Sequence, residues 1–190
     1  MIMSTNTEVK TAGSSANKTK TMALIGVMAA VTCILGPLSL AIPVSPVPIS
    51  LTNLAVYFAI YVLGMKRGTI SYCIYLLLGL VGLPVFAAFT GGAGKLFGPT
   101  GGYLIGFIFM ALICGFFIEK WEKKLYMHFI GMVLGTAVCY VFGTAWLAYT
   151  AHMGFAAALA AGVIPFIPGD LVKILSLIHI SEPTRPLYIS

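Results

Sequence analysis

The chain has 190 residues, of which 59% are hydrophobic and only 8% are charged, and its mean hydropathy is +1.01. Soluble globular domains carry about a quarter charged residues, so this composition excludes that class and indicates an integral membrane protein. The net charge of +6 does not indicate nucleic-acid binding, because the basic residues sit in small groups between apolar runs and form no continuous basic face. The four cysteines lack CxxC or zinc spacing, so we expect free thiols and no metal site.

Residues 1–20 are polar, and we expect a mobile tail there, followed by an all-α membrane domain over residues 21–175. A helix needs about 20 apolar residues to cross the bilayer, and this length holds about six such runs. The first span covers residues 21–42 and remains as an uncleaved anchor. A proline-rich link leads to the second span, residues 49–65, and a tight junction at Lys66 and Arg67 leads to the third, residues 69–89.

A glycine-rich loop then precedes the fourth span, residues 102–118, and a charged linker precedes the fifth, residues 125–148. Residues 155–163 predict a partial helix, and a sixth helix begins near Asp170. Residues 171–180 would supply only about 15 Å of helix before polar sequence returns, which is half a bilayer. The run over residues 176–185 also resembles the translation of a transposon adapter used in sequencing libraries. We therefore interpret residues 176–190 as an atypical tail left by a sequence-assembly junction.

The basic residues predict the orientation of the six spans. Cytoplasmic loops of membrane proteins carry an excess of Lys and Arg, so the side that holds most of them is the cytoplasmic one. With six spans, both termini are cytoplasmic, and the proline-rich link, the glycine-rich loop and the turn at residues 165–170 all face outside. The basic residues on the cytoplasmic side are Lys10, Lys18, Lys20, Lys66, Arg67, Lys120, Lys123 and Lys124.

Asp170 and Lys173 are the first candidates for a binding site, because they share one face of the last helix at a spacing of i and i+3. Charges inside the apolar zone usually mark function. The alternative is a structural ion pair in which Asp170 also caps the helix, and both interpretations can hold together. Asn53 is an amide in an apolar run, so it needs a partner in the protein or in the ligand.

The glycine-rich loop is the second candidate. Glycine permits positive φ and close backbone approach, so its N–H groups can converge on a polar ligand, and Lys95 could contact an anion or simply be an exposed surface lysine. Tyr103, Tyr140 and Trp146 could form pocket walls or serve as interface anchors. The loop residues that we assign to ligand binding are Gly91, Gly92, Gly98, Thr100 and Gly101.

Gly26 and Ala30 give the first helix a small-residue face that another helix, internal or from a partner, could approach closely. The sequence contains no Walker A, HExxH or GxSxG motif, and its three histidines are scattered, so we expect no enzyme and no catalytic residue. An ATP-driven role would need a separate ATPase.

The runs KLFGPTGGYLIGF, PVSPVPISLTNL and PFIPGDLVK resemble the BioY family, the biotin-specific S components of energy-coupling factor (ECF) transporters. The resemblance covers nearly all of residues 21–174. It implies a six-helix S-component bundle in a prokaryotic plasma membrane that captures biotin near the outer face, with no cofactor. The implied partners are a transmembrane coupling protein, which would dock at Gly26 and Ala30, and two cytoplasmic ATPases.

The resemblance also implies where biotin would bind, namely the glycine-rich loop together with Asp170 and Lys173. We assign Asp170 and Lys173 to the polar ring of biotin and Lys95 or the loop N–H groups to its carboxylate, with the reverse arrangement left open. Two alternatives remain at this point: an S component for another vitamin, such as thiamin or riboflavin, and a membrane structural protein without a ligand.

Overall fold

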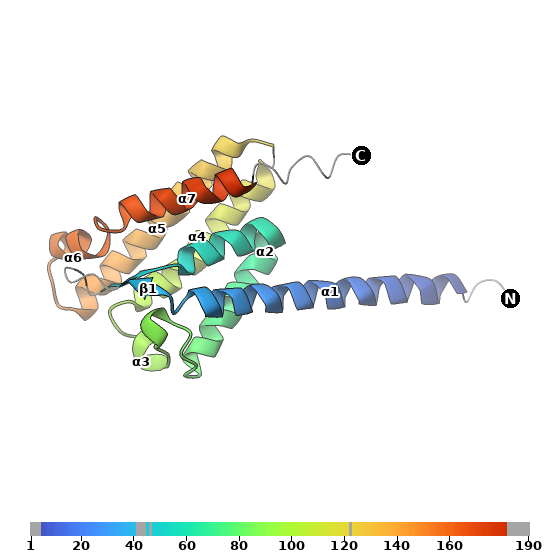
Figure 1. Cartoon of the computed structure of the whole chain (residues 1–190), viewed down its shortest axis with the longest axis horizontal. Helices are drawn as coiled ribbons and strands as arrows, with labels where there is room; N and C mark the ends of the chain where they lie inside the picture. The colour runs from blue at the N-terminus through green and yellow to red at the C-terminus, as the bar shows by residue number, and fades with distance from the viewer. Residues whose placement is uncertain (1–4, 41–44, 46, 122, 182–190) are drawn as a thin grey trace.

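The computed structural model describes residues 5–40, 45, 47–121 and 123–181, and the side chains of residues 17–177 within those ranges. The chain is almost entirely helical (Figure 1). Its helices and strands, in order, are α1 (Thr5–Leu35), β1 (Ser39–Leu40), β2 (Ile49–Ser50), α2 (Thr52–Leu80), a 3-10 turn (Ala87–Phe89), α3 (Ala93–Leu96), α4 (Gly101–Lys120), α5 (Leu125–Thr150), α6 (Phe155–Gly162) and α7 (Ile167–Ser181).

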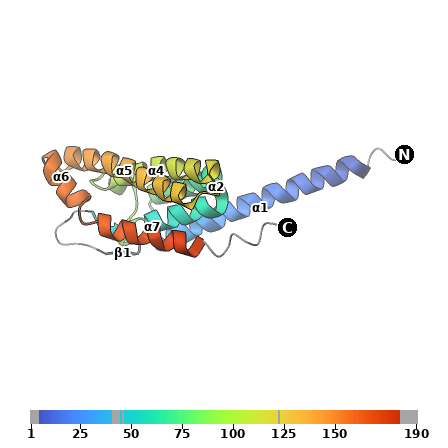
Figure 2. The ribbon, with the colours of Figure 1, turned by 90° about the horizontal axis from the view of Figure 1, so that it is seen from above.

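The first helix, α1, packs on α2 and extends well beyond the rest of the bundle at its N-terminal end (Figures 1 and 2). The polar segment that we expected to be a tail is helical from Thr5 onward, so the helix begins earlier than the apolar pattern predicts. Its mobility stays a prediction. Gly26 and Ala30 are exposed on the outer face of α1, and nothing lies within 4 Å of a Cβ placed on Gly26.

The second helix, α2, is two helices joined by a sharp bend at Gly64, whose φ of 79° and ψ of 175° are not helical. The side chain of Glu119 in α4 caps the second half, because its Oε1 accepts the Met65 N–H over 2.7 Å. The bend lies just before the junction predicted at Lys66. The second arm ends at Leu80, not at Phe89 as predicted, because Gly82, with φ of 110°, and Pro84 interrupt the helix.

Helices α4 and α5 lie side by side along one face of the bundle (Figure 2). Glycines allow this close approach: a Cβ on Gly106 would lie 3.0 Å from the Cys139 sulfur, and one on Gly131 would lie 2.4 Å from Cβ of Phe117. The short helix α6 returns the chain along α5 to α7. The partial helix predicted at residues 155–163 is therefore confirmed.

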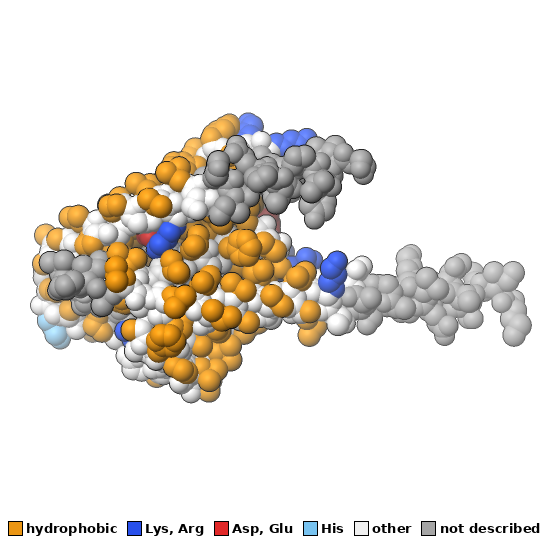
Figure 3. Space-filling model, viewed as in Figure 1, with side chains coloured by type: hydrophobic (Ala, Val, Ile, Leu, Met, Phe, Trp, Pro, Cys, Tyr) orange, Lys and Arg blue, Asp and Glu red, His pale blue; other side chains and the backbone are white. Residues whose placement is uncertain are grey.

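Among the described residues, three helices are long and apolar enough to cross a membrane: Asn17–Leu35, Gly101–Lys120 and Leu125–Thr150. The pair Phe155–Gly162 and Ile167–Leu177, bent by 45°, supplies a fourth if it is one span. The mostly hydrophobic face in Figure 3 fits contact with lipid. Six spans and cytoplasmic termini stay predictions. The proposed tail, residues 176–190, is helical to Ser181, and the remainder lies outside the described residues.

Candidate ligand-binding site

A cavity that is partly open to solvent is lined by α2, α4, α5 and α7 together with the β2 segment and the glycine-rich loop. The empty space there, counted with the open solvent at its mouth, is about 710 Å³. Most of its wall area is apolar, and polar side chains from several elements interrupt it. The apolar side chains are Val47, Pro48, Phe86, Ala87, Leu104, Phe107, Met110, Cys139 and Phe166, and the polar ones include Asn53, Lys95, Thr100, Tyr103, Thr136, Tyr140, Asp170 and Lys173.

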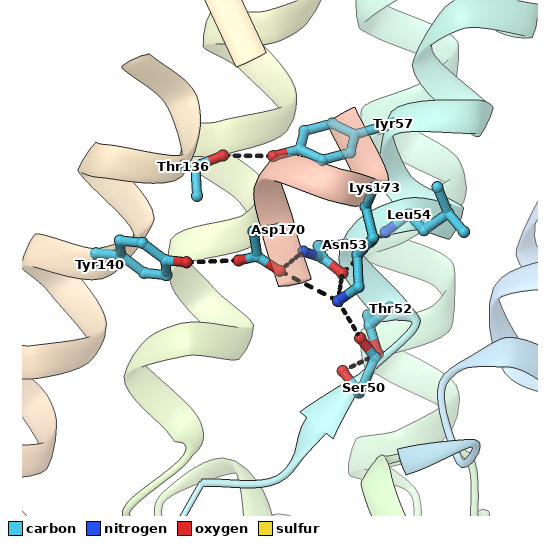
Figure 4. Close-up of polar contacts among 9 residues, drawn as sticks. All are labelled: Ser50, Thr52, Asn53, Leu54, Tyr57, Thr136, Tyr140, Asp170 and Lys173. Atoms are coloured by element: carbon cyan, nitrogen blue, oxygen red, sulfur yellow. Dashed lines mark hydrogen bonds and ion pairs between the residues drawn. The ribbon is translucent and has the colours of Figure 1, made fainter. Parts of the chain in front are cut away.

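Asp170 and Lys173 form an ion pair in the cavity wall, with Nζ 3.1 Å from Oδ1 (Figure 4). The two side chains are only 10% and 12% exposed, respectively, so each charge depends on its partner for compensation. Asp170 lies within the first turn of α7 and its N–H donates to the Phe166 carbonyl over 2.9 Å. It therefore does not cap the helix, which begins at Ile167.

Asn53 finds its partner in this pair. Its Nδ2 donates to Asp170 Oδ1 over 2.7 Å, and its Oδ1 accepts from Lys173 Nζ over 3.0 Å and from the Leu54 N–H over 3.0 Å. The start of α2 thus joins the start of α7, although the two segments are far apart in sequence (Figure 4). The predicted need of Asn53 for a polar partner is met inside the protein.

Lys173 already donates three hydrogen bonds, to the Ser50 carbonyl over 2.8 Å, to Asn53 Oδ1 and to Asp170 Oδ1. An ammonium group has only three N–H donors, so none remains for a ligand unless one of these bonds breaks. Lys173 neutralises Asp170 and fixes Asn53, and it also links both to the end of β2. The structure therefore shows it as the residue that holds the cluster together.

Tyr140 completes the cluster from α5, donating its hydroxyl to Asp170 Oδ2 over 2.6 Å. By valence, Asp170 Oδ2 keeps one acceptor position, Asn53 keeps one N–H, and the Tyr140 oxygen can accept. The cluster thus presents a donor beside acceptors to the cavity. Sequence reasoning named Tyr140 as an aromatic wall, but no signal in the sequence pointed to its bond with Asp170.

Tyr57 and Thr136 form a second polar contact, and the sequence analysis missed both residues. Thr136 lines the cavity and donates its hydroxyl to the Met132 carbonyl over 2.7 Å. Because that hydroxyl has one hydrogen, its short contact with Tyr57 has the tyrosine as donor (Figure 4). This bond joins α2 to α5 beside the cavity. Threonine and tyrosine are too common in membrane helices for such a pairing to be found from one sequence.

Lys95, Thr100 and Tyr103, which the sequence analysis assigned to ligand binding, all line the cavity, and their contact with a ligand stays a prediction. Within the described part of the chain, Lys95 makes no hydrogen bond or ion pair, so its ammonium is available. The Thr100 hydroxyl is buried and has no partner among the described residues. The Tyr103 hydroxyl donates to the Gly162 carbonyl over 3.0 Å and so holds α6 against α4.

Gly91, Gly92, Gly98 and Gly101 do not form part of the cavity wall. Two of them are needed for packing: a Cβ would lie 2.2 Å from the Leu83 carbonyl oxygen at Gly91 and 1.7 Å from the Leu96 carbonyl oxygen at Gly101. Gly92 has φ of 88°, and the Gly98 carbonyl accepts the indole N–H of Trp146 over 3.0 Å. Direct ligand contacts from these glycines stay a prediction. Trp146 anchors the loop and does not line the cavity.

An apolar cavity with one compensated polar cluster, enclosed by membrane helices, defines this chain as a small-molecule-binding membrane protein. Within that class, the chain belongs to the BioY family, whose model matches residues 5–189. Known relatives include the biotin transporter BioY of Thermotoga maritima, 43% identical over 72% of this chain and 79% of the relative. A biotin transporter BioY of Lactococcus lactis is 36% identical over 88% of this chain and 92% of the relative.

The fold also matches a solved structure, the S-component for biotin from an ECF-type ABC transporter. The TM-score is 0.82, with 34% sequence identity, over 90% of this chain and 93% of that one. The family resemblance read from the sequence motifs is confirmed. The family is one of transporter components, so the absence of catalytic motifs agrees with its membership.

Proposed function

We propose that this chain is the biotin-binding S component of an ECF-type vitamin uptake transporter. The observation that carries the proposal is the cavity itself, whose polar cluster offers one amide N–H and free acceptor positions while the rest of its wall is apolar. Biotin has a cyclic urea with N–H donors and a carbonyl acceptor, an apolar thioether ring and a carboxylate. These three parts fit the cluster, the apolar wall and Lys95, respectively.

The hydrogen-bond count supports one orientation of the ligand. Asp170 Oδ2 and the Tyr140 oxygen can accept from the urea N–H groups, and the free Asn53 N–H can donate to the urea oxygen. Lys173, whose three donors are already used, would act through Asp170 and Asn53 and not by direct contact. The assignment of the polar ring to this cluster is kept from the sequence analysis, with Asn53 and Tyr140 taking the direct role that was given to Lys173.

Lys95 is the residue that would bind the carboxylate of biotin, at the end of the ligand opposite the urea. It is the lysine of the cavity wall that makes no bond within the described residues, and it lies in α3 of the glycine-rich loop. A carboxylate placed there would gain a charge-assisted contact, which is roughly twice as strong as a neutral one. Biotin would then lie with its urea toward α7 and its carboxylate toward α3.

The partners and the membrane topology belong to the same proposal. The chain would cross a prokaryotic plasma membrane six times with both termini cytoplasmic, the two arms of α2 providing two of the spans. Gly26 and Ala30 would dock a transmembrane coupling protein, and two cytoplasmic ATPases would supply the energy. The exposure of both small residues on α1 supports this docking face.

Calorimetric titration of the detergent-purified protein with biotin tests the proposal, with thiamin and riboflavin as comparison ligands. We expect saturable, selective biotin binding at submicromolar concentration. Selective binding of thiamin or riboflavin would instead identify an S component for another vitamin. The absence of any saturable ligand from a monodisperse sample would favour the structural-protein alternative. Loss of binding could also come from the atypical residues 176–190. Repeating the titration on a chain with a continuous apolar last helix in their place tests this, because binding would then be restored.

A further inference from the structure

Two separate segments form the outer wall of the cavity. One is the stretch that ends in β2, which contributes Val47, Pro48 and Ser50. The other is the turn after α2, which contributes Phe86 and Ala87. A ligand between them is retained only while both segments stay in place, so a residue that joins them would control how fast it leaves.

Ser39 in β1 joins these segments, although it does not line the cavity. In the antiparallel pair β1–β2, Ser39 lies directly opposite Ser50. Its Oγ also accepts the Ala88 N–H over 2.9 Å, and that N–H is shared with the Pro37 carbonyl at 3.1 Å. Ser39 therefore touches β2 through the backbone and the turn through its side chain.

The turn needs such support because of its backbone. Ala88 and Phe89 have φ of 59° and 56°, a left-handed conformation that non-glycine residues adopt only when neighbouring contacts enforce it. The turn is closed internally by the Phe86 N–H to the Thr90 carbonyl over 2.8 Å. From outside, described side chains supply one hydrogen bond to its backbone, that of Ser39 to Ala88.

The other wall is fixed from the cavity side. The Ser50 carbonyl accepts from Lys173, which also holds Asp170 and Asn53. A continuous set of contacts thus runs from the polar cluster through Ser50 to Ser39, which lies opposite it in the β1–β2 pair, and from the Ser39 hydroxyl to Ala88 and the turn. The end of α1 is packed into the same place, because a Cβ on Gly36 would lie 2.6 Å from the Val85 carbonyl oxygen.

We propose that Ser39 is a positioning residue for ligand retention, whose hydroxyl locks the left-handed turn at Ala88 to the β1–β2 pair and so keeps the two outer walls of the cavity together. This inference rests on the proposed biotin-binding function. It predicts a kinetic effect, since loosening the walls speeds the release of the ligand while the contacts that recognise it are unchanged.

The test compares Ser39→Thr with Ser39→Val, two β-branched side chains of nearly equal shape of which only the first keeps a hydroxyl. Biotin association and dissociation rates are measured by stopped-flow tryptophan fluorescence in a Trp121→Phe background, which leaves Trp146 on the glycine-rich loop as the reporter. We expect Ser39→Val to raise the dissociation rate about threefold, the effect of losing one neutral hydrogen bond, with the association rate nearly unchanged. Ser39→Thr should restore the original rate.

Thr69→Val is the control, because it makes the same loss of one hydroxyl at a residue that does not line the cavity and whose hydroxyl bonds to the Met65 carbonyl within α2. It should leave both rates unchanged. Equal dissociation rates for Ser39→Thr and Ser39→Val would overturn the inference, as would a change confined to the fraction of active protein. If the unmodified chain binds no biotin at all, the proposed function fails instead, and that outcome is distinct from either of these.

Discussion

Asn53 of α2 donates a hydrogen bond of 2.7 Å to Asp170 of α7, although 117 residues separate them in the sequence. Both residues are buried, at 4% and 7% exposure, so each depends on this bond to satisfy a polar group that little water can reach. If the polar end of the ligand binds at this cluster, as we propose, its recognition and the joining of α2 to α7 depend on the same two side chains.

Replacing Asp170 by Asn should weaken biotin binding by about tenfold or more, equivalent to about 1.4 kcal/mol. The amide is nearly the same shape, but it removes the charged acceptor offered to the urea and leaves Lys173 without its counter-ion. Calorimetry measures the affinity, and a gel-filtration profile like that of the unmodified protein shows that the fold is intact. An unchanged dissociation constant would refute the assignment of Asp170 to the ligand.

Replacing Lys173 by Met should destabilise the protein by about 3 kcal/mol, because it leaves the buried Asp170 carboxylate uncompensated. The double variant Asp170→Asn with Lys173→Met should recover part of that loss, since no charge is then left buried. Thermal unfolding in detergent measures both. If the double variant lost as much stability as the two single variants together, the pair would not act as a unit.

Replacing Lys95 by Ala should weaken biotin binding by about tenfold but leave binding of an uncharged biotin amide unchanged, because only the carboxylate needs the ammonium. Lys66→Ala, at the exposed bend of α2, is the control and should bind both ligands normally. Equal losses for biotin and its amide would place the carboxylate elsewhere in the cavity.

Replacing Gly102 by Ala should lower the thermal stability sharply, because the new Cβ would lie 2.2 Å from Cβ of Trp146. Gly94→Ala is the comparison change in the preceding glycine-rich loop, where nothing lies within 4 Å of the new Cβ, and it should be tolerated. Thermal unfolding of the two variants separates glycines required for packing from those that only extend the loop. Equal stability of both variants would contradict the packing described for α4 and α5.

Replacing Gly26 or Ala30 by Leu should leave biotin binding intact and abolish co-purification with the coupling protein, because bulk on this face of α1 keeps the partner helix away. Val27→Leu, on a neighbouring exposed position, is the control. A normal yield of the complex with either small residue replaced would move the docking face to another surface.

The sequence predicted those parts of the site that depend on local spacing or on the cost of burying a polar group. Asp170 and Lys173 were predicted to share a helix face from their separation alone, and Asn53 was predicted to need a partner because an amide cannot remain unpaired in apolar surroundings. Tyr140 and Tyr57 could not be assigned in this way. Their hydrogen bonds depend on which faces of α5 and α2 meet α7 and each other, and this is set by the packing of the whole bundle.

In the fold, too, local sequence patterns predicted some features, and contacts between distant segments set the others. Apolar runs predicted α4, α5 and α6 closely, whereas the bend of α2 at Gly64 depends on Glu119, far along the chain, to cap the second arm. The glycine-rich loop was expected to grip the ligand with its backbone. In the structure Gly91 and Gly101 allow segments to pack at distances that any side chain would prevent, while their contact with a ligand stays a prediction.

The ion pair of Lys173 with Asp170 also sets the net charge of the cavity. Because its ammonium is matched by Asp170, the polar end of the cavity contributes no net charge, and Lys95 is the lysine on the wall whose charge is not balanced within the described residues. A carboxylate ligand seated against Lys95 would bring the occupied cavity to neutrality. Moving a net charge through the membrane potential changes the energy by about 2.3 kcal/mol per 100 mV. The energy of the occupied cavity would therefore be nearly independent of the membrane potential, whereas that of the empty cavity, with one positive charge, would not.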